Sequence, residues 1–303
     1  MSRYARQEVL PEVGPRGQAR LAGAHVLVVG AGGLGSTVLP LLAGAGVGRI
    51  AVVDPDRVEE SNLHRQVLFR QCDLGAAKAE RAARSLSRLN PECHVTGHVA
   101  RLDPDNAPAF AEGVDLVIDA ADSFAVSYAL SDHCRAAGLP LITASVLGRA
   151  GYVAGVCGGA PSLRALFPDL PMTAQTCVSG GVMGPAVAAI GALQAQMALS
   201  VLLGHAPSPL GQVMQLDLAT WRSSGFRFDG APEAPGPAVI APCQIAPHDH
   251  VIDLRLTPDY PAPCPAPEER VVFACNTGLR AWRAARRVME SGHLRVAVIG
   301  YGS

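Results

Sequence analysis

The sequence predicts an α/β protein with a parallel, doubly wound sheet, followed by a smaller α/β tail. Three observations lead to this fold class. Short apolar, β-branched runs alternate with helix-like segments through the first half of the chain. A glycine-rich loop joins the first of these runs to the first helix, as in Rossmann-like sheets. Later, a proline-rich stretch precedes a second, shorter set of strand and helix patterns.

The predicted elements alternate between strand and helix. The strand patterns are apolar on both faces, as expected for buried parallel strands. The apolar segment at 182–203 contains glycine, proline and glutamine and lacks basic flanks, so we expect a buried helix and no membrane span. The predicted strands cover 25–29, 49–53, 114–118 and 140–144, and the predicted helices cover 36–45 and 76–89.

The chain divides into a nucleotide-binding domain at 1–228, a linker at 229–248 and a tail at 249–303. The linker contains five prolines and is expected to be extended and stiff. The tail is short for a domain. It has predicted strands at 251–254 and 270–274 and a basic helix at 278–291.

Composition argues against several classes of function. The 303 residues carry a formal net charge of −1, which disfavours nucleic-acid binding through bulk positive charge. The N-terminus has no apolar signal segment, so we expect a cytoplasmic protein. The eight cysteines form no CxxC pair, which favours free thiols over disulfides or structural zinc. Of the 25 basic residues, only Lys78 is a lysine.

The glycine-rich loop is the first candidate binding site. It contains Gly30, Gly32, Gly33 and Gly35 between a strand and a helix, which lets the backbone and the helix N-terminus approach a phosphate. Asp54 closes the second strand, where a carboxylate accepts hydrogen bonds from ribose hydroxyls. Taken alone, these features predict a nucleotide-binding site without saying which nucleotide binds. An NAD-dependent oxidoreductase would fit them as well as an ATP-binding protein.

The residues after the second strand favour a triphosphate over a dinucleotide. They form a polar loop that ends in SNLHRQ, at 61–66, in place of the next helix. Lys78, near a predicted helix start, would reach phosphates, and Asp122, after the third strand, would hold Mg²⁺. The candidate nucleotide contacts within the polar loop are Ser61, Asn62, Arg65 and Gln66.

Together these motifs resemble the MoeB/ThiF family of sulfur-carrier adenylyltransferases, which are related to ubiquitin-activating enzymes. The resemblance covers roughly residues 3–225 and implies an ATP-dependent adenylation domain. It rests, in chain order, on RYARQ at 3–7, GAGGLG at 30–35, SNLHRQ at 61–66, GAAKAE at 75–80, AADS at 120–123 and TCVSGGVMGP at 176–185.

The resemblance implies a mechanism and partners. ATP would lie on the glycine loop, with its ribose on Asp54 and with Ser123 near the nucleotide. A small ubiquitin-like sulfur carrier ending in Gly-Gly would attack the α-phosphate, giving an acyl-adenylate and pyrophosphate. Arg6 matches an arginine that family members insert into their partner's site, which implies a homodimer. Cys177 matches a cysteine that binds the carrier covalently in some members and is dispensable in others, so both roles stay open.

One family feature is missing from this sequence. Most relatives hold zinc between two CxxC pairs, whereas Ser162 and Ala165 stand at the positions of the first pair and no second pair is found. We therefore predict that zinc is absent and that apolar packing closes this part of the chain. Ser123 also stands where relatives usually have asparagine, which alters the nucleotide contact without excluding it.

The tail resembles a shortened rhodanese-like sulfurtransferase domain. VVFACNTGLRA, at 271–281, predicts a strand, a loop and a helix with Cys275 at the start of the loop. Loop N–H groups, the helix dipole and Arg280 would stabilise a thiolate there. In rhodanese-like domains this cysteine carries a persulfide, which implies a persulfide donor as a further partner. Because the tail is short, a degenerate, non-catalytic appendage remains the alternative.

The combined prediction is an adenylyltransferase for a sulfur-carrier protein that uses ATP and Mg²⁺, with sulfur transfer from Cys275 left open. A non-catalytic scaffold that binds the carrier without activating it is the second hypothesis. An NAD-dependent oxidoreductase is the third, and SNLHRQ together with the single lysine disfavours it.

Overall fold

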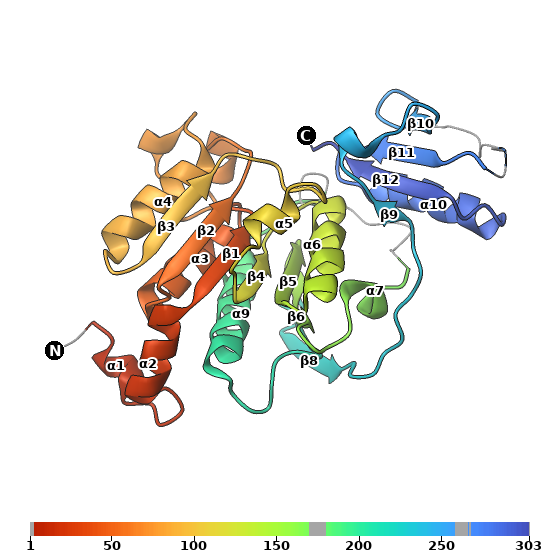
Figure 1. The fold of residues 1–303 in the computed structure, drawn as a ribbon. Coiled ribbons are helices and arrows are strands. Elements are labelled where there is room, and N and C mark those ends of the chain that lie inside the picture. The colour runs from red at the N-terminus through yellow and green to blue at the C-terminus, as the bar shows by residue number, and fades with distance from the viewer. Residues whose placement is uncertain (1–2, 170–179, 258–265, 267, 303) are drawn as a thin grey trace.

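The computed structural model describes residues 3–169, 180–257, 266 and 268–302. The chain forms two α/β units, each built on its own sheet (Figure 1). The larger sheet has eight strands in the order β3-β2-β1-β4-β5-β6-β7-β8, and the smaller has four in the order β10-β11-β12-β9. The α/β class predicted from the sequence is confirmed.

The first five strands of the large sheet are parallel. All but β3 are largely buried, as their apolar sequences predict. The strand order changes direction at β1, which lies between β2 and β4, and α/β proteins bind ligands at such a point. The strands are β1 (His25–Val29), β2 (Arg49–Val53), β3 (His94–His98), β4 (Leu116–Asp119) and β5 (Pro140–Leu147).

Three antiparallel strands extend this sheet beyond β5, and the sequence analysis did not predict them. β6 (Ala150–Cys157) pairs with β5 along its whole length after a turn at Gly148, where φ is +60°. β7 (Gln212–Asp217) and β8 (Arg222–Arg227) complete the sheet. β8 is an exposed edge, so it carries no apolar run that patterning could detect.

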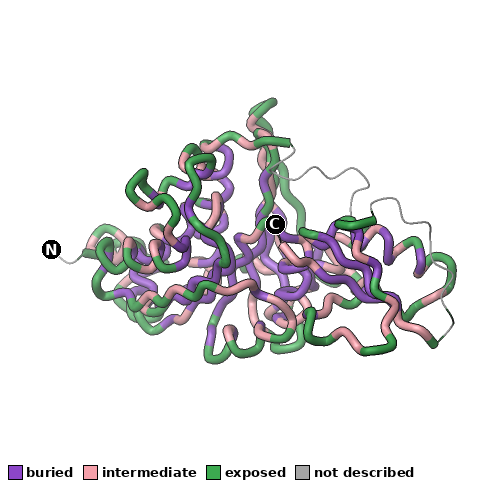
Figure 2. Tube along the Cα trace, turned by 90° about the horizontal axis from the view of Figure 1, so that it is seen from above, coloured by how far each residue is buried: buried purple, intermediate pink, exposed green. Residues whose placement is uncertain are grey.

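Helices cover both faces of the large sheet. α3 (Gly35–Ala45), α4 (Lys78–Leu89) and α9 (Gly184–Leu203) pack on one face, and α5 (Ala107–Phe110) and α6 (Phe124–Ala137) pack on the other. Figure 2 shows the buried residues along the strands and the inner sides of the helices. By length and apolarity α9 would pass as a membrane span, but half of that apolar stretch is buried within the protein, as expected for a core helix.

Short elements complete the large unit. They are α1 (Ala5–Glu8), α2 (Gly14–Gly23), α7 (Leu163–Leu166) and one-turn 3-10 helices at Glu60–Asn62 and Gln71–Asp73. Predicted boundaries differ from the observed ones by up to three residues. The helix expected from residue 76 begins at Lys78, the strand expected at 114–118 begins at Leu116, and the strand expected at 140–144 extends to Leu147.

The tail contains three parallel strands and one helix among its described residues. They are β10 (His250–Asp253), β11 (Val271–Cys275), β12 (Val296–Gly300) and α10 (Leu279–Glu290). Part of the predicted linker also belongs to this sheet, because β9 (Ala238–Val239) pairs with β12. A 3-10 turn at Pro242–Gln244 follows it. A proline-rich segment fits this position, since β9 forms an edge of the sheet.

Candidate active site

The glycine loop leaves β1 and packs against the residues that follow β4. Gly30 has a φ of +100°, and a Cβ atom there would lie 2.5 Å from the carbonyl oxygen of Ala120. Gly35 opens α3, and a Cβ atom there would overlap the carbonyl oxygen of Gly30. Glycine is therefore required at both positions, and the loop holds the N-terminus of α3 beside the ends of β1 and β4.

Asp54, directly after β2, is tied to the glycine loop. Its carboxylate accepts hydrogen bonds from the N–H groups of Ala31, at 2.7 Å, and Asp56, at 2.8 Å. Asp54 is buried, and this burial is the main cause that raises the pKa of its carboxyl. The C-terminal ends of β1, β2 and β4 thus lie side by side at one edge of the large sheet. Nucleotides bind at such an edge in α/β proteins. The contact of Asp54 with ribose stays a prediction.

Gln66 faces this edge from the polar loop. Its Nε2 atom lies 3.8 Å from the position of a Cβ atom on Gly32. The side chain is buried, and its Oε1 atom has no hydrogen-bond partner in the described part of the chain. Because an unpaired buried acceptor is costly, this oxygen fits a hydroxyl or amino donor of a bound nucleotide.

Arg65 and Asn62 are ordered by contacts within the polar loop. The Arg65 guanidinium donates to the carbonyl of Ser61 at 2.9 Å and lies 2.9 Å from Nε2 of His64. Asn62 is buried, and its Oδ1 atom accepts from the N–H of Glu59 at 3.3 Å. The loop is thus ordered by its own contacts, while the phosphate contacts of Ser61, Asn62 and Arg65 stay predictions.

Lys78 lies at the same edge and opens α4. Its Nζ atom is 3.0 Å from a carboxylate oxygen of Asp56, and its backbone N–H donates to the Asp56 carbonyl at 2.9 Å. The N–H of Asp56 donates to Asp54, which in turn accepts from the N–H of Ala31 in the glycine loop. Asp56 and Asp54 therefore link Lys78 to the glycine loop. An ammonium group has three donors. The bond to Asp56 uses one of them, and the others suit phosphate oxygens.

Asp122 and Ser123 stand between β4 and α6. Asp122 is exposed, and a carboxylate at this end of the sheet is the hard oxygen ligand that Mg²⁺ prefers. Ser123 is buried and is the N-cap residue of α6. Its hydroxyl donates to the carbonyl of Thr277 in the tail at 3.3 Å, a partner that the sequence analysis did not predict.

Sequence analysis missed Asp119, the last residue of β4. Its carboxylate accepts from the hydroxyl of Thr143 at 2.8 Å and from the N–H of Ala121 at 3.2 Å. Burial raises the pKa of Asp119 to about 6, and the charge of Asp122 acts in the same direction. Asp119 therefore anchors the segment that carries Asp122. A signal was available, because Asp119 closes its strand much as Asp54 closes the second one.

Arg6 does not reach this edge within its own chain. It lies on α1, whose N-cap residue Tyr4 packs against Gly46 at the C-terminal end of α3. The glycine loop is at the other end of this 11-residue helix, and such a helix spans about 16 Å. Cys177, the remaining predicted site residue of this domain, lies outside the described residues.

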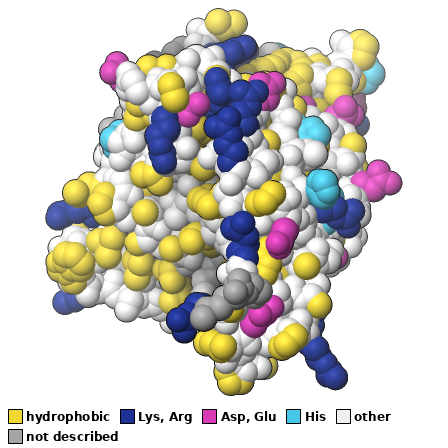
Figure 3. All heavy atoms as spheres, turned by 90° about the vertical axis from the view of Figure 1, so that its left-hand side faces the viewer, with side chains coloured by type: hydrophobic (Ala, Val, Ile, Leu, Met, Phe, Trp, Pro, Cys, Tyr) yellow, Lys and Arg dark blue, Asp and Glu magenta, His cyan; other side chains and the backbone are white. Residues whose placement is uncertain are grey.

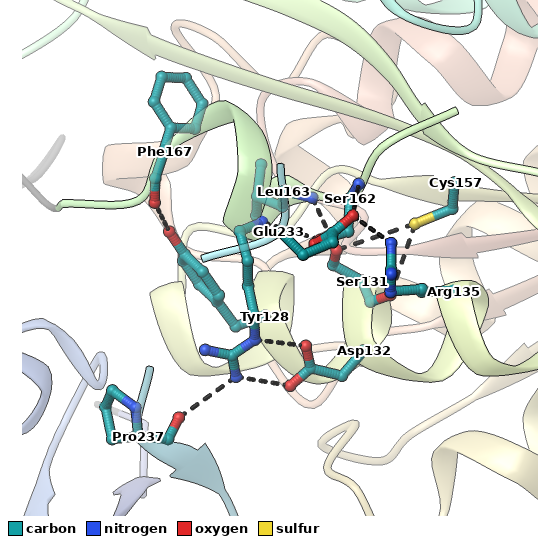
Figure 4. Close-up of polar contacts among 11 residues, drawn as sticks. Tyr128, Ser131, Asp132, Arg135, Cys157, Ser162, Leu163, Phe167, Glu233 and Pro237 are labelled. Atoms are coloured by element: carbon teal, nitrogen blue, oxygen red, sulfur yellow. Dashed lines mark hydrogen bonds and ion pairs between the residues drawn. The ribbon is translucent and has the colours of Figure 1, made fainter. Parts of the chain in front are cut away.

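A polar network occupies the place where the resemblance puts a zinc ligand (Figure 4). The N–H and the hydroxyl of Ser162 donate to the carboxylate of Glu233 at 2.8 and 2.5 Å, and Arg135 forms an ion pair with the same carboxylate. The expectation of apolar packing is confirmed for Leu163, which lies in a buried apolar cluster against which Leu166 packs. The charge of Glu233, which Ser162 and Arg135 satisfy, was not predicted. Among the described residues, no group of three or more His, Cys, Asp or Glu side chains is arranged to hold a metal ion.

Cys275 ends β11 and precedes α10. Its buried sulfur accepts hydrogen bonds from the N–H groups of Gly278, at 3.2 Å, and Ala281, at 3.4 Å. N–H groups directed at sulfur at the start of a helix suit a thiolate or persulfide anion. Arg280 donates to the carbonyl of Leu254 at 2.8 Å, and its effect on the thiol stays a prediction.

The tail is clamped to the large unit through α6 and α7. The rings of Tyr128 and Trp282 lie 4.6 Å apart, and the Arg164 guanidinium lies 5.4 and 5.3 Å from their centres. Arg164 also forms a bidentate pair with Asp132 at 2.6 and 2.7 Å and donates to the carbonyl of Pro237 at 3.2 Å. Figure 4 shows the hydrogen bonds to Asp132 and to the carbonyl of Pro237.

Comparison with known proteins gives consistent matches. The model of the ThiF family matches residues 4–235. The SAMP-activating enzyme E1 of Haloferax volcanii is 38% identical over 237 residues, which cover 78% of this chain and 88% of that protein. The sulfur carrier protein adenylyltransferase of Thermus thermophilus is 43% identical over 227 residues, which cover 72% of this chain and 83% of that protein.

A relative named for two activities is longer. The adenylyltransferase and sulfurtransferase UBA4 of Yarrowia lipolytica is 44% identical over 205 residues, covering 67% of this chain. The match spans 52% of that protein, so the chain covers about half of its length. Among solved structures, Escherichia coli MccB with ATP has a TM-score of 0.66 at 23% identity, covering 77% of this chain and 73% of that one. That likeness concerns the fold alone.

Proposed function

The chain belongs to the ThiF family, and we propose that it uses ATP to activate the C-terminal glycine of a small ubiquitin-like sulfur carrier. Relatives named as adenylyltransferases match across the large unit, and this favours adenylation over NAD-dependent oxidation. One observation carries the proposal. The glycine loop, the ends of β2 and β4 and the single lysine of the chain meet at one edge of the sheet.

In the proposed reaction, the carrier's carboxylate attacks the α-phosphorus of ATP. A bond forms between the carboxylate oxygen and phosphorus, and the bond from phosphorus to pyrophosphate breaks. The N–H groups of the glycine loop and the side chains of Asn62, Arg65 and Lys78 would hold the phosphate oxygens. Catalysis of this kind works by positioning and by neutralising charge.

Magnesium fits the same edge of the sheet. The exposed carboxylate of Asp122 would hold it, and the ion would neutralise phosphate charge when bound. The carboxylate of Asp119 accepts a hydrogen bond from the N–H of Ala121 and so fixes the backbone just before Asp122. We propose no zinc, since Ser162 stands at a ligand position and is bonded to Glu233.

We further propose that the enzyme is a homodimer in which Arg6 completes the partner's site. Arg6 is exposed and remote from the glycine loop of its own chain. Val9 and Leu10, which follow it, are 72% and 45% exposed. Figure 3 faces the left-hand side of Figure 1 and shows hydrophobic side chains beside basic ones on that surface. Exposed apolar groups of this kind fit an interface between copies of the chain.

For sulfur transfer, we propose that Cys275 accepts sulfur from a persulfide donor. The terminal sulfur of the persulfide would attack the acyl carbon of the adenylate, and AMP would leave. A reducing thiol would then cleave the acyl disulfide and release the carrier thiocarboxylate. The two N–H groups that face the Cys275 sulfur support this role. The described cysteines are free, which suits the reducing conditions of a cytoplasmic enzyme.

Exchange of labelled pyrophosphate into ATP tests the adenylation step. The purified chain is incubated with a small ubiquitin-like protein ending in Gly-Gly, or with the same protein lacking its last two residues. We expect exchange only with the intact carrier and a loss of at least about 100-fold in Lys78→Ala and Asp122→Ala. Arg88→Ala, an exposed basic residue in the last turn of α4, is the matched control.

The outcomes separate the hypotheses. Exchange that survives both substitutions would remove the roles assigned to Lys78 and Asp122. Binding of the carrier without any exchange in the unmodified chain would favour the non-catalytic scaffold.

A further inference from the structure

Helix α6 begins next to the proposed magnesium ligand, and its first turn is capped from the other unit. Ser123 is the N-cap residue, and serine in this position normally accepts a hydrogen bond from the first turn of its own helix. Here the Ser123 side chain makes no such bond. The N–H of Ala125 donates instead to the carbonyl oxygen of Thr277 at 3.0 Å, and the Ser123 hydroxyl donates to the same oxygen at 3.3 Å.

The packing around this cap leaves no space for an added methyl group. A Cβ atom on Gly278 would lie 2.7 Å from the Cβ of Ala125, and one on Gly300 would lie 2.6 Å from it. For Gly300, the next nearest atoms, in Asn276 and Gly278, are 3.5 Å away, which is ordinary contact. The methyl group of Ala125 is therefore the single obstacle to a side chain at Gly300.

The end of the tail also reaches the loop after β3, which belongs to the same edge of the large sheet. A Cβ atom on Gly302 would overlap the guanidinium of Arg101. A small cavity at this junction is lined by both units, including Arg101, Ala125 and Tyr301. One turn further along α6, the clamp of Arg164 between Tyr128 and Trp282 also joins the tail to this helix.

We infer that the docked tail is a positioning element of the nucleotide site. The segment 120–123 is anchored by Asp119 at one end and by the carbonyl of Thr277 at the other. If the tail leaves, the first turn of α6 loses this acceptor, and the Ser123 hydroxyl becomes free to cap its own helix. Asp122, the residue just before Ser123, then shifts.

This inference rests on the proposed adenylation function and deepens it. Adenylation, and not sulfur transfer alone, depends on the docked tail. Thr277 and Gly300 act through Ser123 and Asp122, so they are positioning residues and need not touch ATP.

Adding a methyl group at Gly300, with and without removal of the methyl group of Ala125, tests the inference in the full-length chain. Gly300→Ala places a methyl against Ala125, and Ala125→Gly makes room for it. We expect Gly300→Ala to lower kcat/KM for ATP in carrier-dependent exchange by about 10- to 100-fold, mainly through a higher KM and a higher Mg²⁺ requirement. The double variant should return to within about 3-fold of Ala125→Gly alone. Ala136→Gly, at an exposed position on the same helix, controls for the cost of helical glycine.

Two further measurements distinguish a local change at the start of α6 from a general loss of folding. Hydrogen exchange at the Ala125 amide should be faster in Gly300→Ala and return to normal in the double variant, while the strands of the large sheet keep their protection. Calorimetry compares ATP affinity with Mg²⁺ and with EDTA. It should show a smaller Mg²⁺ effect in Gly300→Ala than in the unmodified chain.

Unchanged exchange kinetics in Gly300→Ala would overturn the inference and leave the proposed function intact. A loss that Ala125→Gly does not rescue would also overturn it, because it would indicate a general folding defect. If the unmodified chain shows no exchange with the carrier, the proposed function fails. The calorimetric comparison still decides the inference in that case, since an equal Mg²⁺ effect in both proteins would contradict it.

Discussion

The glycine loop of the large unit and the Cys275 loop of the tail have the same local construction. Each follows a buried parallel strand, precedes a helix and contains a glycine with positive φ, +100° at Gly30 and +86° at Gly278. In the first loop, Gly32 is partly exposed, and the nearby Gln66 oxygen has no described partner. In the second, the Cys275 sulfur accepts from the loop N–H groups, and the loop packs on α6.

The difference shows that local geometry does not decide what such a loop does. Helix N-termini attract anions in both cases. Beside the first loop, the buried Gln66 oxygen has no partner among the described residues. The second loop binds an anion-forming group of its own chain, the Cys275 sulfur. The tail loop also supplies a cap to the large unit, so the two loops are parts of one arrangement around Ser123 and Asp122.

Removing the Cys275 sulfur should have the largest effect on what the two loops do. In Cys275→Ser, we expect ATP–pyrophosphate exchange to change by less than about 2-fold and thiocarboxylate formation to fall by at least about 100-fold, because a hydroxyl cannot carry a persulfide. Intact mass of the carrier after incubation with ATP and a sulfur donor measures the second step.

Cys243→Ser, at an exposed free cysteine, is the control for this experiment. If Cys275→Ser still forms thiocarboxylate at the normal rate, the tail is not the sulfur carrier. Its loop then serves only as a contact surface.

A mixing experiment tests whether the large unit's site needs a second copy. Arg6→Ala and Lys78→Ala should each lose exchange by at least about 100-fold. If Arg6 acts in the partner's site, mixed dimers contain one site with both residues. Randomly exchanged dimers should then recover roughly a quarter of the normal activity. Recovery is measured after mixing and subunit exchange, and a mixture as inactive as its components would refute the composite site.

Loss of the clamp tests how firmly the two units are joined. Trp282 is 4% exposed and packs at a tilt against the ring of Tyr128, so Trp282→Ala should lower the free energy of unfolding of the tail by about 3 to 5 kcal/mol. Trp221, 84% exposed, is the matched control, and its replacement by alanine should change stability by less than about 0.5 kcal/mol. Denaturant unfolding followed by amide exchange separates the two units. Equal effects of the two substitutions would contradict the clamp.

A smaller effect is expected from pH at Asp119. Burial raises the pKa of this carboxyl from 3.8 to about 6 in the folded chain. Between these two pH values, the Asp119 carboxyl is therefore protonated in the folded chain and ionised in the unfolded chain. The resulting stabilisation is fully present below pH 3.8 and is lost as pH rises through about 6.

Asp119→Asn has no proton to release at this position. Relative to this variant, the wild-type chain should lose up to about 3 kcal/mol of unfolding free energy between pH 4 and pH 7. Urea unfolding of both proteins across this range measures the difference. Parallel pH profiles would show that the folded carboxyl titrates normally.

Much of the large unit could be predicted because its signals are local. The strands at His25–Val29 and Arg49–Val53 were predicted to the residue, since each is an apolar run with a polar or glycine boundary. The three antiparallel strands were missed. Arg222–Arg227 is polar because it is an exposed edge, and its pairing depends on a neighbour and not on its own pattern.

The candidate site also contains features that local motifs predicted and contacts that they could not predict. Motif spacing indicated the glycine loop, Lys78 and Asp122. It could not indicate that Glu233 bonds to Ser162, 71 residues away, or that Thr277 bonds to Ser123, 154 residues away. Single polar residues at such separations carry no pattern, because side-chain partners are chosen by the fold and not by spacing along the chain.

The family, the strand–loop–helix turns and the residue types available for phosphate, magnesium and sulfur chemistry could all be predicted from the sequence. These depend on backbone conformation and hydrophobic period, which neighbouring residues set. The groups that each loop faces depend on the tertiary fold. A hydrogen-bond donor or acceptor takes whichever partner packing brings within reach. The carbonyl of Thr277 therefore meets the first turn of α6, and two units that look separate in the sequence share one edge.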